Sequence, residues 1–173
     1  MRWLSLVFVL FLVPSLVWGQ ENTDYRLGPG DVIDIIVYEE QDLSMQVMVS
    51  SSGLVNYPYL GKIKVSGQTP EQVKLSLEHG LAGDYLIDPK IAVNVVSYRQ
   101  IFVNGEVEKP GAYAYQPGLT IEKAVALAGG FSQRAYDGNI TLTPGNGADD
   151  KSKVSLKLSI DPGDIIMVGR RFF

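Results

Sequence analysis

The chain has 173 residues, of which 46% are apolar and 20% are charged, so it is neither a disordered nor a fibrous protein. With 15 basic and 19 acidic residues its formal net charge is −4, which argues against a nucleic-acid-binding protein. It contains no cysteine and a single histidine, His79. Disulfides, a cysteine nucleophile and thiolate or multi-histidine metal sites are therefore excluded.

Residues 1–19 have the pattern of a secretory signal peptide. Arg2 precedes an apolar run over residues 4–13, and Pro14 and small residues follow it. The unbroken apolar stretch is shorter than the roughly 20 residues that cross a bilayer, although an uncleaved membrane anchor is the alternative. We expect cleavage before Gln20. A secreted protein without cysteine suits the bacterial periplasm better than a eukaryotic extracellular space.

The segment 20–98 predicts a first α+β unit. Apolar or alternating runs predict five strands, at residues 32–38, 45–49, 54–57, 62–65 and 90–98. Gly53 lies in a Ser-Ser-Gly turn and predicts that the second and third of these strands form a hairpin.

One helix is expected in this unit, beginning at Pro70. Thr69 is a good N-cap, and Gln72 occupies the third helical position of a capping box. Gly80 or Gly83 should end the helix. Its buried stripe is expected to recur every four residues, at Val73, Leu77 and Leu81.

The segment 99–173 predicts a second unit, with the boundary near Arg99. Strands are expected at residues 101–103, 106–108, 112–115, 139–143 and 154–158. Asn104-Gly105 is a strong hairpin signal. Thr120 should cap an apolar helix that Gly129 and Gly130 end. Strands that wrap one short apolar helix suggest a β-grasp architecture.

The two units share a short motif. Gly28-Pro29-Gly30-Asp31 near the start is echoed by Asp161-Pro162-Gly163-Asp164 near the end, and each precedes a β-branched strand. Proline fixes φ at the first central position of such a turn, and glycine supplies a positive φ at the second. We expect Asp31 and Asp164 to accept hydrogen bonds from nearby backbone amides, which requires no ligand.

Nearly the whole chain after residue 24 resembles the Wza-type polysaccharide export protein family. In the first unit the resemblance lies in residues 25–38, 53–61, 67–71 and 88–98, and in the second unit in 103–113, 119–131 and 162–165. The motif residues that we assign to the family's scaffold are Gly28, Pro29, Gly30, Asp31, Gly105, Pro110, Gly111, Gly129, Gly130, Pro162, Gly163 and Asp164.

The resemblance implies a polysaccharide export domain, a small mixed sheet with one covering helix, followed by one β-grasp domain of the soluble-ligand-binding (SLBB) type. It also implies a periplasmic homo-oligomeric ring or conduit for capsular or exopolysaccharide, working with an inner-membrane polysaccharide copolymerase. It implies no catalytic residue, cofactor or metal. Lacking the lipidated cysteine and C-terminal membrane helix of well-known members, the chain is expected to need an outer-membrane β-barrel partner.

Two other functions fit parts of the sequence. A glycosidase needs two carboxylates about 5 to 10 Å apart, but no motif directs two of the acidic residues toward a common cleft. A carbohydrate- or peptidoglycan-binding module that does not translocate polymer is the stronger alternative. Tyr57 and Tyr59, like Tyr113 and Tyr115, are spaced to share one face of a strand. Such a face could stack against sugar rings, but we prefer the alternative that the rings are buried in the core.

Basic residues are the other candidates for contact with a polymer. An anionic polysaccharide would be repelled by an acidic subunit unless local cations line its path. Lys62 and Lys64 alternate along an expected strand close to Tyr57 and Tyr59. We therefore take Tyr57, Tyr59, Lys62 and Lys64 as possible polysaccharide contacts.

Overall fold

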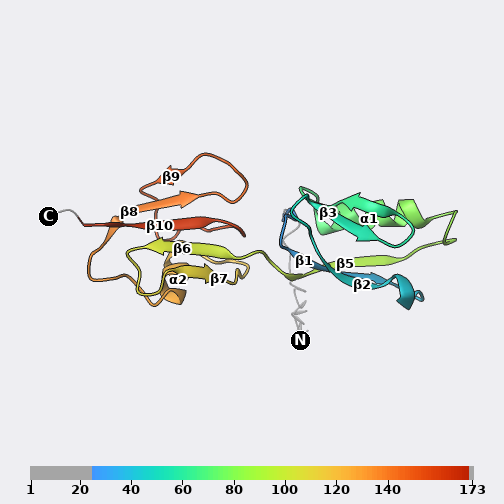
Figure 1. Cartoon of the computed structure of the whole chain (residues 1–173), viewed down its shortest axis with the longest axis horizontal. Coiled ribbons are helices and arrows are strands. Elements are labelled where there is room, and N and C mark those ends of the chain that lie inside the picture. The colour runs from blue at the N-terminus through green and yellow to red at the C-terminus, as the bar shows by residue number, and fades with distance from the viewer. Residues whose placement is uncertain (1–24, 172–173) are drawn as a thin grey trace, which may run out of the picture.

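The structure is a computed structural model that describes residues 25–171, so the expected signal peptide lies outside the described residues. The chain forms two lobes that lie end to end, joined by the short segment between β5 (Ile91–Ser97) and β6 (Ile101–Gly105) (Figure 1). Each lobe has its own cluster of buried apolar residues. The expected mixed α+β class, with one main helix in each half, is confirmed.

The first lobe contains a three-stranded antiparallel sheet, a separate two-stranded hairpin and one long helix. The sheet has the order β2-β1-β5, and the hairpin pairs β3 with β4. The bounds of these elements are β1 Val32–Val37, η1 Gln41–Leu43, β2 Met45–Met48, β3 Leu54–Tyr57, β4 Gly61–Lys64 and α1 Pro70–Leu81.

Helix α1 begins where its capping residues place it. Thr69 Oγ1 accepts a hydrogen bond from the Gln72 amide at 3.2 Å, and Gln72 Oε1 accepts one from the Thr69 amide at 3.0 Å. This reciprocal pair is the capping box expected from the sequence. The stripe of Val73, Leu77 and Leu81 is buried in the first core, as predicted.

The expected hairpin between residues 45–49 and 54–57 is wrong, although the tight turn is present. The Gly53 amide donates to the Ser50 carbonyl at 2.8 Å, but β2 pairs with β1 while β3 pairs with β4. The Gly53 carbonyl accepts from the amides of Val65 and Ser66, at 3.0 and 3.1 Å. These bonds align β3 with β4, so the turn passes the chain from one sheet to another.

The second lobe is a β-grasp unit. Its five-stranded sheet has the order β7-β6-β10-β8-β9, with β6 and β10 parallel at the centre. Helix α2 packs against the face of this sheet that carries Ile166 and Val168. The remaining bounds are β7 Gly111–Tyr113, α2 Ile121–Leu127, β8 Ala135–Thr143, β9 Lys151–Ser152 and β10 Ile165–Arg170.

The ends of α2 follow the sequence signals. Thr120 Oγ1 accepts from the Lys123 amide at 3.4 Å. Gly129 and Gly130 follow the helix with φ of +85° and +94°, in the left-handed region that glycine adopts readily. Within residues 25–171 no helix has the length and apolar character needed to cross a membrane.

Residues 154–158 do not form the expected strand. Their alternating Val154, Leu156 and Leu158 do pack against the second core, which explains the strand-like pattern. The carbonyls of Leu158 and Leu156, however, accept hydrogen bonds from the amides of Ile121 and Glu122 at 3.1 and 3.0 Å. The Val154 amide still donates to the Ile140 carbonyl of β8 at 3.1 Å, but the end of the segment satisfies the free amides at the start of α2 and forms no strand.

The reversal expected at Asn104-Gly105 comes later in the chain. Gly105 is still part of β6, pairs with Val168 of β10, and has a φ of +84°. A Cβ at Gly105 would lie 2.1 Å from the Val168 carbonyl oxygen, so the close approach of the two strands requires glycine. Residues 106–110, expected in part as a strand, form the loop that returns the chain to β7.

Candidate functional site

The two Pro-Gly motifs form nearly identical turns on opposite sides of the junction between the lobes. The Asp31 amide donates to the Gly28 carbonyl at 3.1 Å, and the Asp164 amide donates to the Asp161 carbonyl at 3.2 Å. Gly30 and Gly163 have φ values of +92° and +90°. Both turns therefore have the geometry expected from the sequence.

Asp31, which is 0% exposed, ties the first turn to the segment between the lobes. Its Oδ2 accepts hydrogen bonds from the Gly28 amide at 2.7 Å, from the Tyr25 hydroxyl, and from Arg99 Nη1 at 3.1 Å. Its Oδ1 accepts from the Arg99 amide at 2.8 Å. The carboxylate is thus paired with a guanidinium and saturated with donors, as a buried charge requires.

Asp164 is 4% exposed, and its carboxylate accepts hydrogen bonds from backbone amides only. Its Oδ1 accepts from the Gly145 amide at 2.9 Å, and its Oδ2 accepts from the Asp161 amide at 2.9 Å. These bonds connect the second turn to the glycine-rich loop that follows β8. Both aspartates accept backbone amides, as expected, so neither is a free general base.

The side chain of Arg99 runs between the two turns. A Cβ at Gly28 would lie 2.5 Å from Arg99 Nη1, and a Cβ at Gly163 would lie 2.8 Å from Arg99 Nε. Arg99 therefore passes closely over one glycine of each motif. The sequence marked Arg99 only as a boundary, because nothing local indicates which distant turns a linker arginine will contact.

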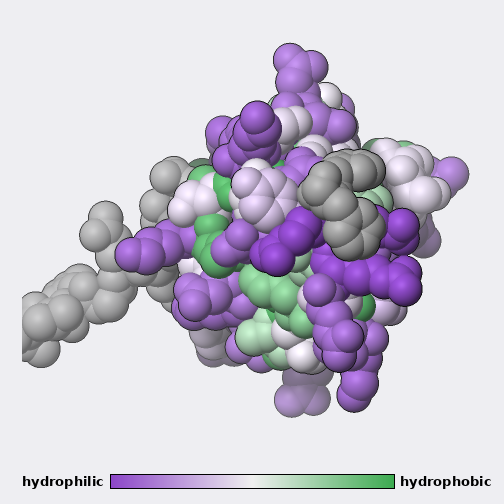
Figure 2. Space-filling model, turned by 90° about the vertical axis from the view of Figure 1, so that its left-hand side faces the viewer, coloured by the Kyte–Doolittle hydropathy of each residue, from purple (hydrophilic) through white to green (hydrophobic). Residues whose placement is uncertain are grey.

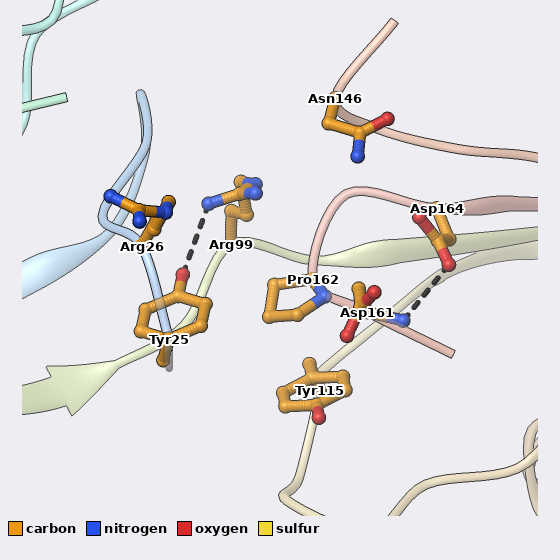
Figure 3. Close-up of a pocket in the computed structure, with 8 residues that line it drawn as sticks. All are labelled: Tyr25, Arg26, Arg99, Tyr115, Asn146, Asp161, Pro162 and Asp164. Atoms are coloured by element: carbon orange, nitrogen blue, oxygen red, sulfur yellow. Dashed lines mark hydrogen bonds between the residues drawn. The ribbon is translucent and has the colours of Figure 1, made fainter. Parts of the chain in front are cut away.

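A cavity of about 390 Å³ opens between the lobes at this point (Figure 3). Figure 3 shows Arg99 reaching toward Tyr25 on one side, with Pro162 and Tyr115 on the other. The residues that line it are Tyr25, Arg26, Arg99, Tyr115, Asn146, Asp161, Pro162 and Asp164.

Three tyrosines cross the junction beside this cavity. Tyr98 makes edge-to-face contacts with Tyr25, at a centroid distance of 4.9 Å, and with Tyr115, at 5.3 Å. Burial, followed by the hydrogen bond to Asp31, raises the pKa of Tyr25 well above its ordinary value. Burial is also the main cause that raises the pKa of Tyr115. Both phenols are therefore neutral at physiological pH, and the junction is a joint held by hydrogen bonds and aromatic packing.

The other motif residues of the second lobe lie away from the junction. The amides of Glu108 and Lys109 donate to the carbonyls of Gly130 and Ala128, at 3.1 and 2.8 Å. These bonds fasten the loop that contains Pro110 to the end of α2, just before Gly111 begins β7. Together with Gly105, these glycines and the proline shape the lobe without meeting the two Pro-Gly turns.

The four expected polysaccharide contacts are separated by the fold. Tyr57 is 2% exposed and its hydroxyl donates to the Leu43 carbonyl at 2.8 Å, so it presents no ring to a polymer. Tyr59 lies beyond the end of β3 in a turn with φ of +62°, and it is 67% exposed. The two rings do not share a face because the strand ends between them. Lys62 and Lys64 are exposed on β4.

No cluster of three or more potential metal ligands occurs in the described part of the chain. Tyr113 and Tyr115 are partly buried and pack against the second core, which agrees with the preferred core interpretation of that pair.

Comparison with known families finds two matches in succession. Residues 19–96 match the family described as Polysaccharide biosynthesis/export protein, and residues 100–152 match the SLBB domain. Arg99 lies in the short interval between them. The first match corresponds to the lobe of α1, and the second covers most of the lobe of α2.

Individual relatives have consistent names. The chain is 30% identical to the EPS I polysaccharide export outer membrane protein EpsA of Ralstonia nicotianae, over 85% of this chain and 46% of EpsA. It is 34% identical to the exopolysaccharide production protein ExoF of Rhizobium meliloti, over 66% of this chain and 30% of ExoF. It is 28% identical to the capsule polysaccharide export outer membrane protein CtrA of Neisseria meningitidis, over 69% of this chain and 36% of CtrA. The chain thus spans less than half the length of each of these relatives.

Proposed function

This chain belongs to the Wza-type family of polysaccharide export proteins, and we propose that it is a periplasmic subunit of an oligomeric conduit for capsular or exopolysaccharide. The observation that carries this proposal is the succession of the two family domains in the family's order, each on its own folded lobe. The division into residues 1–19, 20–98 and 99–173, as signal peptide, export domain and SLBB domain, is part of the proposal.

The junction supports a role as a building block of a ring. Repeated packing of identical subunits requires that the two lobes keep a constant relative orientation. Arg99 contacts Asp31 and passes over Gly163, so one side chain engages both lobes. Such a joint makes the two-lobed subunit a single unit for assembly.

The second lobe has an uncovered sheet face that suits contact with another copy. Phe102, Ile165 and Met167 are exposed on β6 and β10, on the side opposite the buried Ile166 and Val168. At the end of this lobe that carries the C-terminus, apolar side chains gather below the centre among hydrophilic ones (Figure 2). Exposed apolar surface of this kind is typical of interaction sites.

The proposed partners follow from the family. They are the exported polysaccharide, a second copy of this chain, an inner-membrane polysaccharide copolymerase and an outer-membrane partner that completes the path. We propose that the chain reaches the periplasm through cleavage of residues 1–19. No nucleic acid is among the proposed partners, given the net charge of −4.

Deletion of the gene tests the proposal. Polysaccharide is measured outside the cell and in the periplasm, in the deletion strain and in a strain complemented with the gene. We expect the external polymer to be lost, periplasmic polymer to accumulate, and both changes to be reversed by complementation. Unchanged secretion in the deletion strain would contradict a role in export.

Light scattering on the purified protein tests the oligomeric part separately. A ring subunit is expected to form a particle of many chains. A monomer that binds oligosaccharide would instead favour a carbohydrate- or peptidoglycan-binding module that does not translocate polymer. The observation that favours this second function is the exposed ring of Tyr59, which could stack against a sugar.

A further inference from the structure

An exposed cluster of tyrosines lies at the end of the first lobe farthest from the second lobe. Tyr59, in the turn between β3 and β4, and Tyr85, in the loop after α1, have ring centroids 4.9 Å apart and ring planes 34° from parallel. They are 67% and 47% exposed. Tyr38, at the distal end of β1, is also exposed, and we call these three residues the distal tyrosine surface. The loop after α1 forms the right-hand end of Figure 1.

The backbone holds this surface in unusual conformations. The non-glycine residues with positive φ in the described chain are Glu39, at +68°, Tyr59, at +62°, and Lys153. Two of the three therefore lie in or beside the distal tyrosine surface. A positive φ costs a non-glycine residue free energy and persists where the surroundings fix it. Leu60 provides such an anchor, because its side chain lies against Gly80 of α1.

A recess of about 580 Å³ adjoins the rings of Tyr38 and Tyr85. Its charged lining residues are Glu39, Glu40, Asp88 and Lys90. The ammonium group of Lys90 is 3.8 Å from Asp88 Oδ2. Because the lining has three carboxylates and one ammonium group, the recess has a net negative charge. Carboxylates accept hydrogen bonds from hydroxyl groups but repel an anionic ligand.

We propose that the distal tyrosine surface binds an uncharged saccharide chain by stacking its rings on Tyr59 and Tyr85. Tyrosine offers a flat apolar face with a hydroxyl at its edge, which matches the apolar C–H faces and hydroxyl rim of a sugar ring. Glu39, Glu40 and Asp88 accept hydrogen bonds from hydroxyls of the neighbouring sugar. The proposal rests on the export function only for the identity of the polymer. It replaces Tyr57 with Tyr85 among the contacts expected from sequence.

The test is an NMR titration of the ¹⁵N-labelled protein with two hexasaccharides, neutral laminarihexaose and anionic hexagalacturonate. We expect laminarihexaose to shift the amide signals around Tyr38, Tyr59 and Tyr85, and hexagalacturonate to shift them much less. Tyr59→Ala and Tyr85→Ala should each weaken binding of laminarihexaose by about fivefold, the equivalent of about 1 kcal/mol for one aromatic contact.

Tyr136→Ala is the matched control, since Tyr136 is 46% exposed on β8 of the other lobe. It should leave the affinity unchanged. Absence of shifts with laminarihexaose, an equal loss in the control, or tighter binding of hexagalacturonate at the tyrosines would overturn the proposal. If the amide signals around the tyrosines shift with protein concentration and not with saccharide concentration, the surface binds a second copy of the chain and the proposal is wrong. None of these outcomes depends on the deletion phenotype, so either proposal can fail alone.

Discussion

The two Pro-Gly-Asp turns share one local design but have different tertiary partners. Gly30 and Gly163 have φ values within a few degrees of each other, and both aspartates are buried. Asp31 pairs with Arg99 and accepts the Tyr25 hydroxyl, whereas Asp164 accepts two backbone amides. A repeated motif can therefore form the same turn twice while the aspartate of only one copy bonds to the inter-lobe segment.

Removing the first aspartate should have the largest effect. Asp31→Ala leaves Arg99 without its partner and leaves the Gly28 amide buried and unpaired. We expect a loss of about 4 kcal/mol in the free energy of unfolding, measured by urea denaturation followed by circular dichroism. Asp149→Ala, in an exposed loop, is the control and should change it by less than about 0.5 kcal/mol. A loss in Asp31→Ala as small as in the control would mean that the cluster does not stabilise the junction.

Removing the second aspartate should cost less. Asp164→Ala unpairs the amides of Gly145 and Asp161 but leaves no buried arginine alone. The expected loss is about 2 kcal/mol in the same urea experiment. A loss equal to that of Asp31→Ala would break the proposed asymmetry between the two turns.

The third residues of the two turns, Gly30 and Gly163, have nearly the same positive φ, so an alanine at either position meets the same backbone strain. Gly30→Ala places a Cβ 3.5 Å from Arg99 Cβ, an ordinary contact, whereas Gly163→Ala places one 2.8 Å from Arg99 Nε. We expect Gly30→Ala to cost about 1 kcal/mol from its positive φ. Gly163→Ala should cost about 2 kcal/mol because Arg99 must also move. The reverse order in urea denaturation would show that Arg99 yields freely at the second turn.

The smallest expected effect is a pH dependence at the first turn, where Tyr25 contacts Asp31. The pKa of Tyr25 is raised in the folded state, so below its ordinary value of 10.0 the phenol is protonated in both states. As the pH rises above 10, the unfolded state loses this proton while the folded state keeps it, and unfolding becomes more favourable. Because solvent reaches part of the ring, we expect about 0.5 kcal/mol at pH 11.

Tyr25→Phe checks this effect, because phenylalanine cannot ionise. The free energy of unfolding of the variant should fall less between pH 9 and pH 11 than that of the unsubstituted protein. Parallel pH profiles for the two proteins would indicate that burial and the hydrogen bond to Asp31 do not protect Tyr25 from ionisation.

Features that depend on a few neighbouring residues were predictable from the sequence. The capping box at Thr69, the buried stripe of α1, the glycine stop after α2 and the two Pro-Gly turns all follow from local hydrogen bonding and allowed backbone angles. The resemblance carried by these motifs also led to the family that the comparisons support.

Features that depend on distant partners were not predictable. Residues 154–158 alternate like a strand, but the free amides of α2 compete for their carbonyls. Tyr57 and Tyr59 are two residues apart, yet one is buried and the other exposed because β3 ends between them. Nothing in the sequence around Tyr85 indicates that its ring contacts the ring of Tyr59.

The turns, the helix ends, the buried stripes and the family could all be predicted from the amino-acid sequence. These depend on φ preferences, side-chain-to-amide hydrogen bonds and hydrophobic periodicity, which act within a few residues. In contrast, the pairing of the strands, the choice of Asp31 as the partner of Arg99 and the exposure of particular tyrosines became visible only in the folded chain. Those outcomes depend on segments such as Asp31 and Arg99, 68 residues apart, that compete for partners only after the chain has folded.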